Sequence, residues 1–367
     1  MATKYIEYPP RVLQGQSALK FNRTRKMLIY KGDNDVASHI SRGLPLYETK
    51  LQEKRGENEN GNLIMRGECI SACAYLLENN IQVDLVYIDP PFASGADYAK
   101  KVYLRRNPKI AEELAKAETE LDNEDMRTFE AKMYGDIWEK EKYLNWMYEN
   151  LMAIKSVMSP TASIYVHLDY HIGHYVKILL DEVFGESNFR NEIIWFYNNK
   201  MSGNTTSHAF VCEHDSIFLY SNSDENIYNT LYEKREESIK QSKRVKVDGK
   251  NMRARDENGN IIYEVSEEKK IKDVWQIPYI ASTDSQRTGY ATQKPEALLE
   301  RIIKASSDEG MVVADFFGGS GVAAAVAHKT GRRFIHVDIN DNSISTARDR
   351  LVKEGAFTRR SRAVEIL

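Results

Sequence analysis

The chain has 367 residues, of which 42% are hydrophobic and 29% are charged, and its formal net charge is −3 at pH 7. This composition is typical of a globular protein with one large domain or two ordinary ones, and it excludes a globally basic nucleic-acid binder. No apolar run is long enough to span a membrane, the N-terminus lacks the apolar core of a signal peptide, and three scattered cysteines exclude a disulfide framework. We therefore expect a cytoplasmic protein.

The first half of the chain alternates between strand and helix patterns. Short runs rich in β-branched, aliphatic and aromatic residues predict strands at 26–31, 83–88, 162–168 and 191–197. Apolar residues at helical spacing predict helices at 143–158 and 175–184, which Pro160 and Gly185 follow. This alternation indicates an α/β fold with a mostly parallel sheet.

The stretch from 198 to 273 is polar and has a different character. Runs at 243–247 and 261–265 predict hairpin strands around a turn at Asn258-Gly259. Six basic residues crowd the same region: Lys243, Arg244, Lys246, Lys250, Arg253 and Arg255. A charge run is usually a solvated surface, but this group also gives a mildly acidic chain a local site for DNA phosphates. We predict an inserted region at 198–273, within a discontinuous domain formed by residues 1–197 and 274–367.

The α/β pattern returns after the insertion. Alternating helix and strand patterns follow one another at 295–306, 311–315, 322–330 and 333–338. Two strands joined by one helix form a βαβ unit, so the strands at 311–315 and 333–338 are expected to be parallel neighbours.

The tetrapeptide Asp89-Pro90-Pro91-Phe92 follows the strand predicted at 83–88. Ligands of open α/β sheets bind at this carboxyl edge. Both prolines lack an N–H and fix their own φ, so the segment is stiff and extended. The Asp89 carboxylate and the Pro90 carbonyl are left as acceptors beside the flat face of Phe92, which suits a planar group with an amino substituent. A simple turn after a strand is the competing interpretation.

A glycine-rich turn, Asp315-Phe316-Phe317-Gly318-Gly319-Ser320-Gly321, follows the strand predicted at 311–315. Glycines let the backbone approach a ligand closely and adopt positive φ. Asp338 ends the next strand, where an acidic residue of a Rossmann-like unit hydrogen-bonds ribose hydroxyls. The turn matches neither Gly-x-Gly-x-x-Gly nor a Walker loop, so a nucleoside without phosphates is favoured over a pyrophosphate. A structural tight turn is the competing interpretation.

Together these segments resemble the amino-methylating DNA methyltransferases that use S-adenosylmethionine. Residues 89–92 match the catalytic motif of that family, Asp/Asn/Ser-Pro-Pro-Tyr/Phe/Trp, and residues 317–321 resemble its cofactor loop, Phe-x-Gly-x-Gly. The catalytic motif comes first and the insertion lies between them, as in the β group, where the insertion is the target recognition region. Gly32-Asp33 and Thr292-Gln293-Lys294-Pro295 are also similar to family segments. Residues 163–195 are similar to the modification subunits of type III restriction systems.

The resemblance implies a Rossmann-like methyltransferase sheet with a circularly permuted motif order, acting on double-stranded DNA. By the family pattern, Asp89 and the Pro90 carbonyl accept hydrogen bonds from the target amino group. Pro91 belongs to the same motif, and Phe92 stacks on a base flipped out of the duplex. The aspartate form of the motif favours N6 of adenine, by analogy with the family.

The resemblance also implies S-adenosylmethionine as the cofactor. Its expected contacts are Asp33, Lys294, Asp315, Phe316, Phe317, Gly318, Gly319, Ser320, Gly321 and Asp338. Within this set, Asp338 is expected at the ribose, Asp33 at the adenine end and Lys294 at the carboxylate.

Several alternatives stay open at this point. The target amine is N4 of cytosine in one alternative, and an RNA base or a protein amide in another. A further alternative is a non-catalytic specificity subunit that binds DNA through a methyltransferase fold. A restriction-endonuclease partner and a homodimer are both compatible with the resemblance. His167, His171 and His174 cross a strand end and a loop rather than following a metal-ligand pattern, so we expect no metal.

Overall fold

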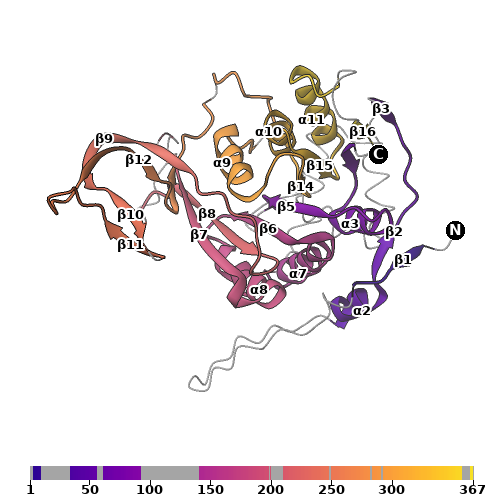
Figure 1. Ribbon diagram of the computed structural model, residues 1–367. Helices are drawn as coiled ribbons and strands as arrows, with labels where there is room; N and C mark the ends of the chain where they lie inside the picture. Colours follow the sequence, from indigo (N-terminus) through magenta and orange to yellow (C-terminus); the bar gives the residue numbers. More distant parts are fainter. Residues whose placement is uncertain are drawn as a thin grey trace.

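The computed structural model describes residues 3–9, 34–55, 61–91, 140–197, 199, 210–247, 249–281, 283–290, 292–357 and 364–366. The strand predicted at 26–31 and the candidate residues Asp33 and Phe92 lie outside these ranges. The described residues are organised around a ten-stranded sheet with the order β13-β7-β8-β6-β5-β14-β15-β4-β16-β3 (Figure 1).

The centre of this sheet is parallel. It contains β6 (Met158–Leu168), β5 (Val83–Ile88), β14 (Val312–Asp315), β15 (Arg333–Asp338) and β4 (Asn62–Arg66). These strands are apolar and almost wholly buried, as expected where helices cover both faces of a sheet. The strands predicted at 83–88 and 333–338 are confirmed, and the expected parallel βαβ unit is formed by β14, α10 (Val322–Lys329) and β15.

Each edge of the sheet adds strands of mixed direction. On one side, β8 (His214–Ser221) runs antiparallel to both β6 and β7 (Phe189–Phe196), and β13 (Val274–Gln276) is parallel to β7. On the other side, β16 (Val364–Ile366) pairs with β4 and with β3 (Glu53–Arg55). A separate small ladder joins β1 (Lys4–Ile6) to β2 (Leu44–Leu46).

Helices cover the two faces of the sheet and bury two apolar clusters. Contacts on one face involve α2 (Asn34–Arg42), α3 (Cys69–Glu78), α7 (Lys140–Val157) and α8 (Gly173–Phe184), followed by the 3₁₀ turn η1 (Glu186–Asn188). The other face carries α9 (Glu296–Ser306), α10 and α11 (Asp341–Lys353). Alternation along β5 supplies both clusters, since Val86 and Ile88 join the first and Leu85 and Tyr87 the second.

Residues 232–270 form an arm outside the main sheet, consisting of β9 to β12. A long ribbon pairs β9 (Tyr232–Ser242) with β12 (Tyr263–Lys270), and a short hairpin pairs β10 (Arg244–Val247) with β11 (Lys250–Arg253). The arm projects from the body of the protein (Figure 1). Within the region predicted as an insertion, 198–273, β8 instead belongs to the main sheet, because it pairs with β6 and β7.

The strand pairing predicted inside the arm is wrong in one respect. The run at 243–247 pairs with β11 across a turn at Gly249, and the run at 261–265 pairs mainly with β9. The turn at Asn258-Gly259 does form, with φ of +82° at Gly259, and it is closed by hydrogen bonds between Asp256 and Asn260 and by an isolated bridge between Arg255 and Ile261. Gly249, at a φ of +77°, lies between β10 and β11 and makes the tighter hairpin.

Candidate active site

A cavity of about 540 Å³ lies along the carboxyl edge of the central strands. Its lining includes Asp89 after β5, Asp315 at the end of β14 and Asp338 at the end of β15. Parallel strands place their carboxyl ends at the same edge of the sheet. These three carboxylates therefore meet in the cavity although they are far apart in the chain. The location agrees with the edge predicted from the sequence.

Asp89 is paired with Lys294 inside this cavity. The Lys294 ammonium donates a hydrogen bond to Asp89 Oδ2, and only 7% of the Lys294 side chain and 18% of the Asp89 side chain are exposed. Burial lowers the pKa of Lys294, but the charge and hydrogen bond of Asp89, together with the charges of Asp215 and Tyr279, outweigh burial and raise the pKa above its usual value, so the ammonium stays protonated. The other oxygen, Asp89 Oδ1, is buried and has no hydrogen-bond partner among the described residues.

Contacts on both sides of Lys294 fix the segment Thr292-Gln293-Lys294-Pro295 in place. Gln293 accepts hydrogen bonds from the N–H and hydroxyl of Thr288, both at 2.9 Å, and donates to the Gln286 carbonyl at 2.7 Å. Pro295 caps the start of α9, so the segment is fixed on both sides of Lys294. This arrangement holds the ammonium at Asp89.

The glycine-rich turn is packed against β15. Gly318 donates to the Val337 carbonyl at 2.9 Å, and Gly319 donates to Asp338 Oδ2 at 2.9 Å. A Cβ on Gly318 would lie 2.2 Å from the His336 ring, so only glycine fits at this position. The turn therefore lies directly on the strand that carries Asp338, with Gly319 at a φ of +49°.

Asp315 starts the same turn and is 3% exposed. Burial raises the pKa of Asp315 well above its usual value, although the carboxylate accepts a hydrogen bond from the Phe317 N–H at 3.0 Å. The charges of Asp89 and Asp338 act in the same direction as burial. A raised pKa at a cavity wall is typical of functional sites.

A buried polar chain supports the opposite end of the cavity. Tyr87 Oη lies 2.9 Å from His167 Nδ1, and His167 Nε2 lies 3.2 Å from Asp215 Oδ2. The Tyr197 hydroxyl donates to Asp215 Oδ1 at 3.2 Å. Burial raises the pKa of Asp215, but the hydrogen bond and charge of His167, together with Lys294, lower it below the usual value overall.

The sheet order divides the cavity into two ends. The β15 end is lined by Tyr290, Phe317, Gly318, Gly319, Ser320 and Asp338. The β6 end is lined by Asp169, Tyr170, His171, Tyr197, Cys212 and Asp215. Since β5 and β14 lie between β6 and β15, Asp89 stands between the two ends.

Ten of the fourteen predicted catalytic and cofactor-binding residues lie in this one cavity. Its walls include Asp89, Pro90, Pro91, Lys294, Asp315, Phe317, Gly318, Gly319, Ser320 and Asp338. Phe316 is not among the lining residues, because it is 1% exposed and packs in the core on the α3 and α7 face. Gly321 is also outside the lining and begins α10 in a left-handed conformation, with its Cβ position 2.6 Å from Ala347.

The six predicted DNA-binding residues lie on the arm, away from the lining of the cavity. Lys243, Arg244, Lys246, Lys250, Arg253 and Arg255 are all exposed. Pairing of Arg244 with Arg253 and of Lys246 with Asn251 places these four on one face of the hairpin. Lys250 belongs to the other face.

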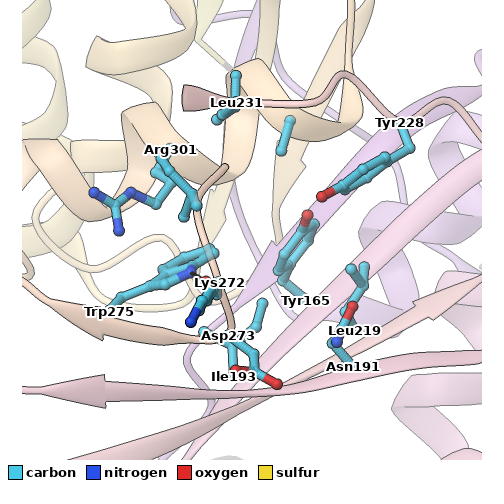
Figure 2. A pocket seen from close by; sticks show the side chains of 12 residues that line it. Tyr165, Asn191, Ile193, Leu219, Tyr228, Leu231, Lys272, Asp273, Trp275 and Arg301 are labelled. Carbon is cyan, nitrogen blue, oxygen red and sulfur yellow. Dashed lines mark hydrogen bonds between the residues drawn. The ribbon is translucent and has the colours of Figure 1, made fainter. Parts of the chain in front are cut away.

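A second cavity, of about 310 Å³, lies at the root of the arm (Figure 2). Arg301 on α9 connects its walls: the guanidinium lies 5.3 Å from the Trp275 ring centroid in β13 and 3.6 Å from Glu233 at the start of β9. Tyr165 and Tyr228 close another side. These contacts join the start of the arm, and the strand β13 that follows its end, to α9, so we assign this cavity to the attachment of the arm.

The described ranges hold no group of three or more His, Cys, Asp or Glu side chains placed to bind a metal ion. No helix within them is long and apolar enough to cross a bilayer.

The chain belongs to the DNA methylase family, whose profile matches residues 83–349, more than half of its length. It is therefore an S-adenosylmethionine-dependent methyltransferase. It is 27% identical over 285 residues to the type II methyltransferase M.HpaI of Haemophilus parainfluenzae, covering 78% of this chain and 72% of that protein.

Two further relatives are similar over most of this chain. The DNA adenine methyltransferase YhdJ of Escherichia coli K12 is 26% identical over 269 residues, 73% of this chain and 76% of that protein. The StyLTI Mod subunit of a Salmonella typhimurium type III restriction-modification enzyme is 24% identical over 332 residues, 73% of this chain. The chain spans about half the length of that subunit, with 50% covered.

The walls of the cavity suit S-adenosylmethionine. Asp338 is 3% exposed at the β15 end, where a ribose hydroxyl would satisfy its carboxylate, and the Gly318-Gly319 backbone leaves room beside it. Lys294 is the only lysine or arginine among the described residues that line the cavity, and its charge is matched by Asp89. A site with so little positive charge favours a nucleoside without phosphates.

Proposed function

We propose that this enzyme methylates the N6 amino group of adenine at specific sites in double-stranded DNA, on a base flipped out of the duplex. The observation that carries the proposal is the buried Oδ1 of Asp89, which has no hydrogen-bond partner in the described part of the chain and lies beside the rigid Pro90-Pro91 segment. A buried acceptor without a donor is costly, and a ligand amino group would satisfy it. The relative YhdJ, an adenine methyltransferase by name, supports adenine as the base.

The chemistry assigned to Asp89 follows from the weakness of the nucleophile. An exocyclic amine delocalises its lone pair into the ring, which makes it unreactive toward an alkyl donor. Asp89 Oδ1 and the Pro90 carbonyl accept hydrogen bonds from the two N–H groups of this amine. These bonds draw the hydrogens out of the ring plane, so the lone pair is localised on the nitrogen. Lys294 fixes the other carboxylate oxygen, so Oδ1 is held in place before the base arrives.

S-adenosylmethionine, when bound, supplies an electrophilic methyl group, and we assign it to the β15 end of the cavity. Asp338 would bind the ribose hydroxyls, with Asp315, Phe317, Gly318, Gly319 and Ser320 around the rest. The β6 end then receives the target base. Holding two reactants in this relation accounts for several kcal/mol of barrier reduction, without a covalent intermediate.

We assign DNA contact outside the cavity to the arm. The face of the hairpin that carries Arg244, Lys246, Asn251 and Arg253 combines phosphate-binding and base-reading side chains. A two-stranded ribbon has the dimensions needed to enter the major groove. These exposed cations can bind phosphates at a small free-energy cost, because no buried ion pair has to be broken first.

The proposal is tested with labelled S-adenosylmethionine and unmethylated DNA, RNA or protein. We expect label in DNA alone and, after digestion to nucleosides, in N6-methyl-2′-deoxyadenosine. Label in N4-methylcytosine would refute the adenine assignment, and label in RNA or protein would refute DNA as substrate. If the protein binds DNA but transfers no label to it, the proposed methylation is wrong.

The matched variants Asp89→Asn and Asp89→Ala test the role of the carboxylate. We expect Asp89→Asn to lower the methylation rate by about 10²- to 10³-fold, the range seen when one preorganised polar group is lost. Asp89→Ala should abolish methylation while cofactor binding, measured by calorimetry, stays largely intact. Near-normal turnover in either variant would rule out this mechanism.

The relation to the StyLTI Mod subunit, named as part of a restriction-modification enzyme, extends the proposal to a restriction-endonuclease partner. We also propose that two copies of this chain pair. Because the substrate is DNA, we place the enzyme in the cytoplasm. Sedimentation of the purified chain at several concentrations tests for the homodimer, and a single monomeric species throughout would contradict it.

A further inference from the structure

The turn after β6 presents an aromatic pair beside the catalytic acceptor. Strand β6 is the parallel neighbour of β5, with Ile88 opposite Val166, so the residues after Leu168 continue alongside Asp89-Pro90-Pro91. Tyr170 and His171 line the same cavity as Asp89. They lie at the β6 end, across Asp89 from Asp338.

The pair is held rigidly. Asp169 Oδ1 accepts a hydrogen bond from the His171 backbone N–H at 3.0 Å, and Asp169 Oδ2 lies 2.8 Å from His171 Nδ1. The Tyr170 ring stacks on the His171 ring with a centroid distance of 3.9 Å and an interplanar angle of 29°. Its position is therefore set before any ligand binds.

Tyr170 is nevertheless 58% exposed. A large aromatic side chain on a cavity wall, backed by a second ring and open to solvent, is an unfilled stacking surface. Heteroaromatic bases stack well on such a surface, and each stacked base contributes substantially to nucleic-acid binding. The S-adenosylmethionine assigned to the β15 end lies on the far side of Asp89, so it does not occupy this position.

We propose that Tyr170, supported by His171, stacks on the flipped target base and determines how strongly the enzyme holds it. This inference rests on the proposed function, since it requires a base at the β6 end of the cavity. The tyrosine offers its ring face to the base. Little side-chain entropy is lost on binding, because the ring is already stacked on His171.

A double-mutant cycle between the side chain and the base tests this. The DNA carries the site that the wild-type enzyme methylates, with either adenine or an abasic nucleotide at the target position. We expect Tyr170→Ala to weaken binding of the adenine-containing duplex about tenfold. For the abasic duplex, where there is no base to stack on, the loss should stay below about twofold on the same reasoning.

Three comparisons complete the experiment. Tyr170→Phe keeps the ring and should bind both duplexes as the wild type does. Tyr47→Ala removes a tyrosine of similar exposure, 61%, which follows β2 and lines neither cavity, and it should change neither affinity. A mispaired target, which is cheaper to flip, should partly rescue Tyr170→Ala, whereas it would not rescue a misfolded protein.

Two results would overturn the inference. An equal loss on the adenine and abasic duplexes would show that Tyr170 contacts the DNA elsewhere, and no loss on either would show that it makes no contact. In either case the wild-type enzyme would still methylate DNA, so the proposed function would stand. Absence of methylation by the wild-type enzyme would instead overturn the proposed function, and this inference with it.

Discussion

The cavity and the arm of this protein handle charge in opposite ways. Around the cavity, the strands β5, β14 and β15 are almost wholly buried, and Lys294 is paired with Asp89 in the interior. On the arm, every residue of β10 and β11 is exposed, and its cations face solvent. Substitutions in the cavity should therefore change folding and chemistry together, whereas substitutions on the arm should change only contact with DNA.

The largest effect is expected from Lys294→Met. This change leaves Asp89 as a buried charge without its partner, which typically costs about 3 to 5 kcal/mol of stability. Urea unfolding measures the cost, and methylation should be lost in parallel. The double variant Asp89→Asn/Lys294→Met removes both charges and should recover most of the stability but none of the activity. If Lys294→Met is as stable as the wild type, the ion pair does not contribute as described.

Next in size is a pH effect at His336. Burial lowers the pKa of His336 from 6.5 to about 4, so the unfolded chain binds more protons between these two pH values. The free energy of unfolding should then decrease as pH falls from about 6.5 to about 4, by about 3 kcal/mol in all. Urea midpoints measured across this range should show the loss. His336→Gln should remove this part of the pH dependence, and an unchanged slope would contradict the assignment.

A smaller loss is expected from Gly318→Ala. The added Cβ would lie 2.2 Å from the His336 ring, and overpacking of this kind costs about 1 to 3 kcal/mol. Gly67→Ala is a matched control, since its Cβ meets only the Ser71 hydroxyl at 3.5 Å. Thermal unfolding and calorimetric titration of the cofactor measure the two consequences. Equal melting temperatures for both variants would mean that the turn tolerates a side chain.

The smallest effect on folding is expected on the arm. Arg244→Ala/Arg253→Ala should leave the melting temperature and cofactor affinity unchanged but weaken DNA binding. If each arginine meets one phosphate, the slope of log affinity against log salt should become less steep by about 1.8, roughly 0.9 per contact. Binding measured between low and moderate salt gives this slope. A drop in stability would break the contrast between arm and cavity.

Local patterns predicted much of the fold and part of the site. The strands at 83–88 and 333–338, the proline-rich motif at 89–91 and the glycine-rich turn are each recognisable within a few residues, because buried strands and tight turns restrict composition locally. Parallel packing then required that their carboxyl ends meet. The structure adds the finding that Lys294, expected at a cofactor carboxylate, lies at Asp89 across 205 residues of sequence.

The β6 end of the cavity was not predicted. Asp215 reaches it on β8, a strand that lies within the range expected for the insertion, and the sequence predicts no role for His167. Tyr197 joins them from β7. These contacts depend on which antiparallel strand enters the sheet next to β6, and no local pattern of hydrophobicity or turn residues encodes that choice.

The attachment of the arm has a consequence for how new specificities arise. Its first and last strands leave and rejoin the body side by side, since the Ile271 N–H donates to the Leu231 carbonyl at 3.0 Å. A segment whose two ends are one hydrogen bond apart can be replaced as a unit without altering the strands that form the cavity. Under the proposed role of the arm in DNA contact, such a replacement would change the DNA sequence that is recognised while the methyl transfer stays the same.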